Sequence, residues 1–323
     1  MGQAPKSSVF SRKIVNLFAG MAFGSPDLPP TLKDAAYSCH SIEQSFTVET
    51  NFVVNPEVVL CSDMDQHTLI VEAKSGANLN PAQLERYTLV NPECLQKSAL
   101  TTASAAKKHD LLVIGLEQWK DRLLLGSSKV PSDRRVIAVA DIAFDDEGNG
   151  SPGSADSVQP YQGIMRIENQ FSTPRLNDAF NPTLEVDWDV VPNIYLPVDH
   201  ESLDWEFAEF MMPEIISAIL RGDQVMTLEE LAATVIRHWK IISAKYQTML
   251  LDCMRRVLKQ AAQKRFSSFM KFGEKGQKKN EVVLMIPQNL TENIAAQRAQ
   301  LNKRLRDFME DLNSPQIAMI YEA

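Results

Sequence analysis

The chain has 323 residues and a formal net charge of -8 at pH 7, and its length exceeds one ordinary domain of about 100 to 200 residues, so we expect two domains. No apolar run approaches the roughly 18 to 20 residues that span a bilayer, and neither a signal peptide nor a myristoylation pattern is present, so we expect a cytoplasmic protein without a membrane partner. The four cysteines form no CxxC pair, which argues against a structural zinc site and a disulfide framework.

The predicted elements begin with an N-terminal segment, residues 1–30, that ends in a cluster of prolines. A helix is then predicted over residues 31–46. Two apolar, β-rich runs follow at residues 57–61 and 68–72, and a short polar connection joins them. This pattern predicts a β-hairpin.

A second helix is expected over residues 81–87, with Pro at an early and tolerated helical position. Further along, the apolar runs 110–115 and 135–140 predict strands, and the amphipathic stretch 118–125 predicts a crossover helix between them. The order is α-β-β-α-β-α-β. It indicates an α/β fold.

Residues 145–157 are rich in Gly, Ser, Pro and acidic residues, which is typical of a mobile loop. Residues 159–199 hold prolines and scattered aromatics without a firm pattern. We assign both stretches to a first domain of residues 31–200. A second domain, residues 201–290, begins where helical patterns dominate, and a C-terminal helical segment, residues 291–323, follows it.

Within the second domain, helices are predicted at residues 203–221, after Thr227 with a capping-box spacing to Glu230, and at residues 241–265. A β-hairpin is expected next, because apolar runs flank a turn rich in Gly and Lys. Three helices followed by a hairpin indicate a winged helix-turn-helix. The last helix, residues 291–312, has an apolar stripe that packs on the body or pairs with another copy.

Positive charge is concentrated in this second domain, although the chain as a whole is acidic. Residues 254–279 contain one acidic residue, Glu274, and nine basic residues: Arg255, Arg256, Lys259, Lys264, Arg265, Lys271, Lys275, Lys278 and Lys279. They fall on the expected recognition helix and wing. We therefore predict that they contact nucleic-acid phosphates, with a solvated face as the alternative.

The candidate catalytic and metal-binding residues lie in the first domain. Residues i and i+2 of a strand share a face, so Glu72 and Lys74 project side by side, and hairpin pairing brings Glu57 close to Glu72. Two converging carboxylates suit a hard cation such as Mg²⁺. Gln83 and Tyr87, four residues apart on the next helix, can reach the metal shell or a phosphate.

Pro56-Glu57, then Glu72-Ala73-Lys74, then Gln83-Leu84-Glu85-Arg86-Tyr87 resemble the PD-(D/E)XK nuclease superfamily, in particular its RecB-like branch with a QhxxY helix. The resemblance covers about 60 residues. It implies a restriction-endonuclease-like core with a mixed central sheet, dependence on Mg²⁺ or Mn²⁺, and DNA as the usual substrate. It also implies an acid from the first helix as a further metal ligand, and Glu43 fits that place best. The chain departs from the family in having Glu at position 57 where Asp is usual.

Taken together, these features predict a metal-dependent DNA endonuclease of restriction or phage defence, working as a homo-oligomer or within a larger complex. Two alternatives stay open: a non-cleaving scaffold or nucleic-acid-binding subunit, which Glu57 favours, and a ribonuclease. Asp63 or Asp65 could replace Glu57 as ligand, and His40 could enter the site. A histidine metal site or catalytic triad is not expected, because the five histidines show neither HxxxH nor HxH spacing.

Overall fold

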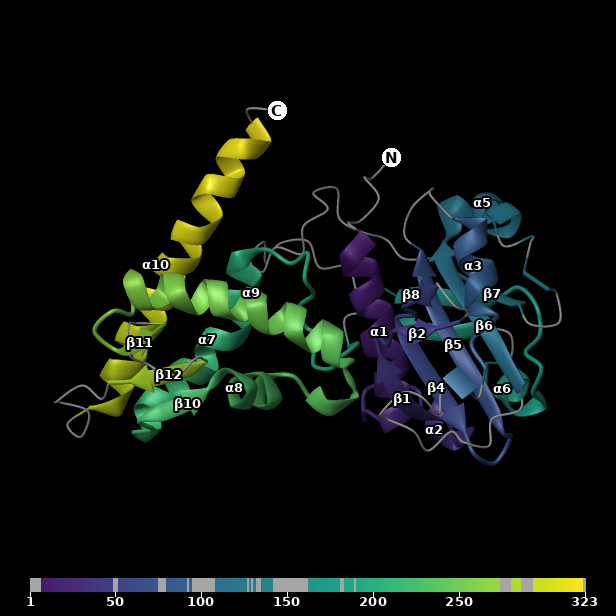
Figure 1. Cartoon of the computed structure of the whole chain (residues 1–323), viewed down its shortest axis with the longest axis horizontal. Coiled ribbons are helices and arrows are strands. Elements are labelled where there is room, and N and C mark those ends of the chain that lie inside the picture. Colours follow the sequence, from purple (N-terminus) through teal and green to yellow (C-terminus); the bar gives the residue numbers. More distant parts are fainter. Residues whose placement is uncertain are drawn as a thin grey trace. The chain divides into compact units, whose positions relative to one another are not determined.

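The computed structural model describes residues 7–48, 52–74, 80–91, 93–94, 108–126, 128, 130–131, 135–141, 162–180, 183–188, 190–273, 280–285 and 293–321. The chain forms two compact units, which are described one at a time (Figure 1). The first comprises Met1–Leu196 with Ile241–Ser243, and the second comprises Pro197–Lys240 with Ala244–Ala323. The loop predicted at residues 145–157 lies outside the described residues.

The first unit is built on a seven-stranded mixed sheet of order β1-β4-β5-β6-β7-β8-β9. β6 is parallel to both β5 and β7, and the remaining neighbours are antiparallel. The strands are β1 (Ser38–Ile42), β4 (Val58–Ser62), β5 (His67–Lys74), β6 (Lys108–Leu116), β7 (Arg135–Asp141), β8 (Gln162–Ile167) and β9 (Thr183–Asp187). A separate hairpin joins β2 (Phe46–Thr47) to β3 (Val53–Val54). The predicted α/β class with a mixed central sheet is confirmed.

Helices pack on both faces of this sheet (Figure 1). They are α1 (Ser7–Phe23), α2 (Thr31–Asp34), α3 (Pro81–Tyr87), the 3₁₀ turn η1 (Glu117–Trp119), α5 (Lys120–Gly126) and α6 (Pro174–Phe180). α1 contacts β1, β4 and β5. On the other face, side chains of α3 and α5, including Leu84 and Leu123, join a core with Val59, Ile70 and Val113.

The predicted hairpin is confirmed as β4 and β5, which pair in antiparallel register through Val58 opposite Val71. Its apolar sequence reflects burial on both faces: all of β4, and β5 except Lys74, is buried. The predicted helix at residues 81–87 is confirmed as α3. The Asn80 side chain caps it by accepting the Ala82 amide, and Pro81 occupies the first turn.

The helix predicted over residues 31–46 is wrong. Only Thr31–Asp34 is helical, Ala36 takes a left-handed φ of 60°, and the chain then forms β1. Pairing with β4 buries Cys39 and Ile42. This gain outweighs local helix propensity, which is a weak preference.

The first 30 residues are part of the first unit rather than a separate segment. They form α1, whose apolar face has no exposed surface at Phe10, Ile14, Leu17 and Phe18. Asn16 fixes the helix to the end of the unit: its Oδ1 accepts the amides of residues 194–196 at 2.9 to 3.1 Å, and its Nδ2 donates to the Leu196 carbonyl at 2.9 Å.

The second unit contains a three-stranded antiparallel sheet of order β10-β12-β11 and four α-helices among its described residues. In chain order the elements are α7 (Asp204–Arg221), β10 (Val225–Thr227), α8 (Leu228–Val235), α9 (Ala244–Gln263), β11 (Met270–Phe272), β12 (Glu281–Leu284) and α10 (Ile294–Tyr321). The 3₁₀ turn η3 (Trp239–Ile241) precedes α9, and its last residue, Ile241, is assigned to the first unit. The predicted capping box is confirmed, since Thr227 accepts the Glu230 amide and Glu230 accepts the Thr227 amide.

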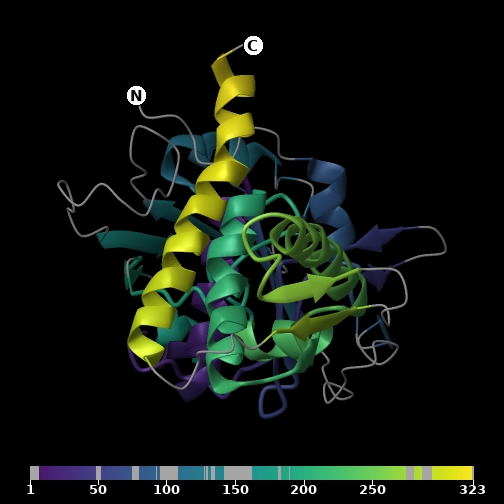
Figure 2. The same cartoon turned by 90° about the vertical axis from the view of Figure 1, so that its left-hand side faces the viewer.

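α10 runs alongside α7 within this unit (Figure 2). Its predicted apolar stripe is buried at Leu301, Leu305, Phe308 and Leu312, whereas Ile294 is 54% exposed. Most of the stripe therefore packs on the body of the unit. In the described part of the chain, no helix combines the length and the apolar character that crossing a membrane requires.

Candidate metal centre

The predicted site lies at the end of β5, where two charged side chains share one face of the strand. Glu72 is 1% exposed and Lys74 is 20% exposed. Lys74 Nζ forms an ion pair with Glu72 Oε1. The neighbours of the opposite face, Val71 and Ala73, are buried as the strand alternation predicts.

Glu57 is the residue immediately before β4. Because Val58 pairs with Val71, the next position outward in the hairpin places Glu57 opposite Glu72. Glu57 is 8% exposed, and its Oε1 accepts the hydroxyl of Ser11 at 3.3 Å. Ser11 comes from α1, 46 residues earlier, and no sequence motif marks it. The structure thus adds one polar residue to the predicted set.

The helix residues Gln83 and Tyr87 support this carboxylate pair from α3. The Tyr87 hydroxyl donates to Glu72 Oε1 at 2.9 Å, and Gln83 Nε2 donates to the Tyr87 hydroxyl at 2.9 Å. Burial, followed by the negative charge of Glu72, raises the pKa of the Tyr87 phenol. Tyr87 therefore stays protonated and acts as a hydrogen-bond donor.

One oxygen of each carboxylate is buried without a hydrogen-bond partner in the described structure: Glu57 Oε2 and Glu72 Oε2. Burial raises the pKa of Glu72 well above its ordinary value, and the charge of Glu57 raises it further, against the opposing effect of Lys74. Burial lowers the pKa of Lys74, but neighbouring carboxylates, chiefly Glu72, hold it above its ordinary value. Two orphaned, electronegative oxygens beside a single ammonium fit a bound cation.

Glu43 does not come from a helix, contrary to the expectation. It follows β1 with a left-handed φ of 52°, and its amide donates to the Glu57 carbonyl at 3.0 Å. Its carboxylate acts on Lys74 electrostatically. The first helix, α1, contains no acidic residue to take that role. Among the described residues, no three side chains of His, Cys, Asp or Glu converge as metal ligands, so backbone oxygens or water would have to complete a shell.

The alternative ligands considered for the site lie elsewhere. Asp63 and Asp65 occupy the turn between β4 and β5, at the opposite end of the hairpin from Glu57 and Glu72. Asp65 forms an ion pair with Arg175. His40 is buried in β1, where its Nδ1 lies 3.1 Å from Ser41 Oγ, and burial lowers the pKa of its imidazole.

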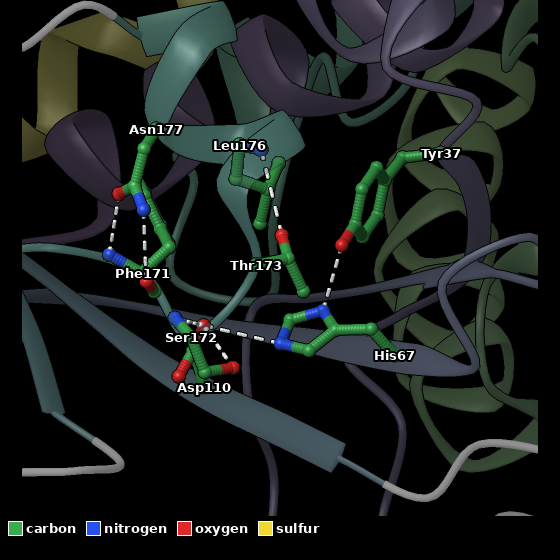
Figure 3. Close-up of polar contacts among 8 residues, drawn as sticks. All are labelled: Tyr37, His67, Asp110, Phe171, Ser172, Thr173, Leu176 and Asn177. Carbon is green, nitrogen blue, oxygen red and sulfur yellow. Dashed lines mark hydrogen bonds and ion pairs between the residues drawn. The ribbon is translucent and has the colours of Figure 1, made fainter.

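A second polar cluster lies at the start of β5 and β6 (Figure 3). His67 Nδ1 lies 2.8 Å from the Tyr37 hydroxyl, and His67 Nε2 lies 3.1 Å from Asp110 Oδ2. The amide and hydroxyl of Ser172 donate to the same Asp110 oxygen at 2.8 and 3.1 Å. Ser172 contacts the aspartate rather than the histidine, and His67 has no exposed surface, so the order of a nucleophilic triad is absent from this cluster. We interpret it as a structural tie between strands and the α6 region.

The described basic residues of the second unit are partly engaged within that unit. Arg256 donates to Asp204 at 2.6 and 2.9 Å, Arg265 donates to Asp311 at 2.8 and 3.0 Å, and Arg255 donates to Asn280 at 2.9 and 3.1 Å. The lysines of the set with described side chains, Lys259, Lys264 and Lys271, are exposed. Lys275, Lys278 and Lys279 lie outside the described residues. Lys259 and Lys264 are thus better candidates for phosphate contact than these arginines, whose guanidinium groups already donate hydrogen bonds within the unit.

The site is therefore a buried pair of carboxyl groups, Glu57 and Glu72, beside the ammonium group of Lys74. The chain is an α/β protein with a candidate cation centre. Comparison with protein-family models matches residues 11–188 to the MJECL32 domain. This match covers more than half of the chain, so the protein belongs to the MJECL32 domain family. Comparisons with curated proteins and with solved structures gave no significant match.

Proposed function

We propose that the first unit is a metal-dependent nuclease that hydrolyses phosphodiester bonds, with Mg²⁺ or Mn²⁺ as its cofactor. The observation that carries the proposal is the pair of buried carboxylate oxygens, Glu57 Oε2 and Glu72 Oε2, that lack hydrogen-bond partners beside Lys74. Buried carboxyl oxygens that lack hydrogen-bond partners are costly, so a cation that binds both would stabilise the site.

The surrounding residues supply the remaining parts of such a centre. A divalent cation held by Glu57 and Glu72 would supply positive charge against the charge that builds on a phosphate in the transition state. Lys74, which is partly exposed, can orient a water molecule or donate to a phosphate oxygen. Gln83 and Tyr87 hold Glu72 in place through two successive hydrogen bonds. In this arrangement they position a ligand and do not bind substrate directly.

The resemblance to the PD-(D/E)XK superfamily supports the same proposal. Two of its sequence elements, Glu72-Ala73-Lys74 and the Gln83–Tyr87 helix, meet through hydrogen bonds and an ion pair. The third element is close to them because the hairpin register places Glu57 opposite Glu72. The hairpin, the following helix and the parallel strand β6 agree with a restriction-endonuclease-like core, which we propose as the finer fold assignment. The MJECL32 match contains all of these elements.

The second unit is proposed to be a winged helix domain that binds DNA. Its order of helix, strand, two helices and two strands, with β12 between β10 and β11, supports this assignment. The exposed lysines of the basic region, including Lys259 and Lys264, would contact phosphates. DNA is proposed ahead of RNA, and restriction or phage defence is the proposed setting.

The test is cleavage of plasmid DNA and of matched RNA, with and without Mg²⁺ or Mn²⁺. Lys74→Ala should abolish metal-dependent cleavage while leaving the fold intact by circular dichroism. Lys120→Ala is the matched control, because Lys120 also pairs with a glutamate, Glu168, but lies outside the site. Equal cleavage by wild type and Lys74→Ala would refute the nuclease.

Calorimetry separates the nuclease from a non-cleaving scaffold. A metal centre predicts Mg²⁺ or Mn²⁺ binding that is lost in Glu72→Ala. Wild-type protein that neither binds the metal nor cleaves would refute the nuclease and leave the non-cleaving scaffold as the alternative.

A further inference from the structure

An aromatic ring and a guanidinium are stacked at α3, the helix that supports the carboxylate site. The Cζ atom of Arg86 lies 4.1 Å from the centroid of the Phe52 ring. Arg86 belongs to α3, one turn after Gln83 and directly before Tyr87, the two residues that hold Glu72. Phe52 immediately precedes β3 of the small hairpin. The stacked pair is thus attached to the same helix that supports the proposed metal centre.

Neither side chain of this pair is fully buried in the core of the unit. Phe52 lies two residues before Val54, yet Val54 is 3% exposed in the core whereas Phe52 is 39% exposed. Val53, next to Phe52, and Leu89, three residues after Arg86, are exposed as well. Arg86 forms no ion pair with any described residue. An exposed apolar group beside a partly buried guanidinium that has no ion pair among the described residues is typical of an interaction surface.

Stacked aromatic and guanidinium groups match a particular ligand chemistry. Nucleobases stack on the faces of aromatic rings and on guanidinium planes, and arginine also attracts the phosphates that join the nucleotides. A base inside a duplex has both faces covered by its neighbours, so such a platform accepts only an unpaired nucleotide. The platform therefore selects for strand state rather than for sequence.

We propose that Phe52 and Arg86 form a base-stacking platform that gives the centre its substrate class, single-stranded nucleic acid. This inference rests on the proposed nuclease function and adds substrate preference to it. An unpaired base stacked on the pair would place its strand at α3, the helix whose Tyr87 holds Glu72. Duplex nucleic acid gains nothing from the platform.

The test uses the full-length protein and a short single strand that carries 2-aminopurine, whose fluorescence is quenched by stacking. Binding is measured in EDTA, so that cleavage does not interfere. Phe52→Ala and Phe52→Leu should each remove the quench and weaken binding about 10-fold, as expected for the loss of one stacked base. Phe52→Trp should retain both.

Val53→Ala is the matched control, because it removes a neighbouring exposed apolar side chain that lies on the other side of the strand. It should leave binding and quench unchanged. Arg86→Lys keeps the charge without the planar group, so it should retain the salt dependence of binding and lose part of the quench. With Mg²⁺ or Mn²⁺, Phe52→Ala should slow cleavage of single strands by the same factor and leave duplex cleavage unchanged.

Failure of this inference can be told from failure of the nuclease. Equal quench and affinity in Phe52→Ala and Val53→Ala would overturn the platform, even if the protein cleaves duplex DNA. An equal loss of duplex and single-strand affinity in Phe52→Ala would overturn it too, because the platform contributes nothing to duplex binding. A quench that depends on Phe52 without any metal-dependent cleavage would support the platform and refute the nuclease.

Discussion

Replacing Glu72 by Gln should change how the stability of the first unit depends on pH and on divalent metal. Burial, and next the charge of Glu57, raise the pKa of Glu72 in the folded protein, so the folded state holds its proton more tightly than the unfolded chain does. The contribution of protonated Glu72 to the free energy of unfolding is fully present below the unfolded pKa of 4.5, and it is lost as pH rises toward the folded pKa.

The magnitude follows from proton linkage. One proton retained only in the folded state reduces the free energy of unfolding by about 1.4 kcal/mol for each pH unit above the unfolded value, until the folded pKa is reached. Glu72→Gln cannot ionise and should lack this decline. A cation that binds the ionised pair counteracts the decline, and at 100 times its dissociation constant it adds about 2.7 kcal/mol. The wild type should therefore gain metal stabilisation at neutral pH, whereas Glu72→Gln should not.

The assay is urea unfolding of wild type and Glu72→Gln between pH 4.5 and 8, in EDTA and in saturating Mg²⁺ or Mn²⁺. Following tryptophan fluorescence and circular dichroism together checks that both probes report one transition. Equal pH slopes for the two proteins in EDTA would refute the assignment of the raised pKa to Glu72. Equal metal stabilisation would refute its role as a ligand.

Three further predictions concern other parts of the chain. His67→Ala should lower the free energy of unfolding by about 3 kcal/mol in urea titrations, because it leaves Tyr37 without its buried partner, whereas the exposed His200→Ala should change it by less than about 0.5 kcal/mol. Asn16→Ala should speed hydrogen exchange of the amides at residues 194–196, and unchanged protection would contradict the role of its side chain. If the second unit binds DNA, Lys259→Ala should reduce the slope of log K against log salt by about 1.

The sequence predicted those parts of the site that depend on local periodicity. Glu72 and Lys74 share a face because they are two residues apart on a strand, and Gln83 and Tyr87 share a face because they are four apart on a helix. The hairpin register then places Glu57 opposite Glu72. Each of these relations follows from backbone geometry over a short span of chain.

Relations across long spans of chain were not predictable in the same way. Ser11 and Glu57 are 46 positions apart in the sequence, and they meet only because α1 packs against β4. That packing depends on the burial of apolar side chains and not on any local spacing. The misassigned helix at residues 31–46 has the same origin. Its residues satisfy helix propensity locally, but the edge of the sheet offers Cys39 and Ile42 a partner strand. The His67 cluster also joins positions that share no spacing signal.

The contact with Ser11 explains how a Glu, in place of the usual Asp, can serve at position 57. On both carboxylates, Oε1 is held by a donor from another element, Ser11 for Glu57 and Tyr87 for Glu72, while Oε2 is left without one. A side chain one methylene longer than Asp has more conformers, and the Ser11 hydroxyl restricts them. We infer that Ser11 is a positioning residue that makes Glu suitable at this place. Ser11→Ala should then weaken metal binding and Glu57→Asp should not restore it, because the shorter side chain withdraws its oxygens from the centre.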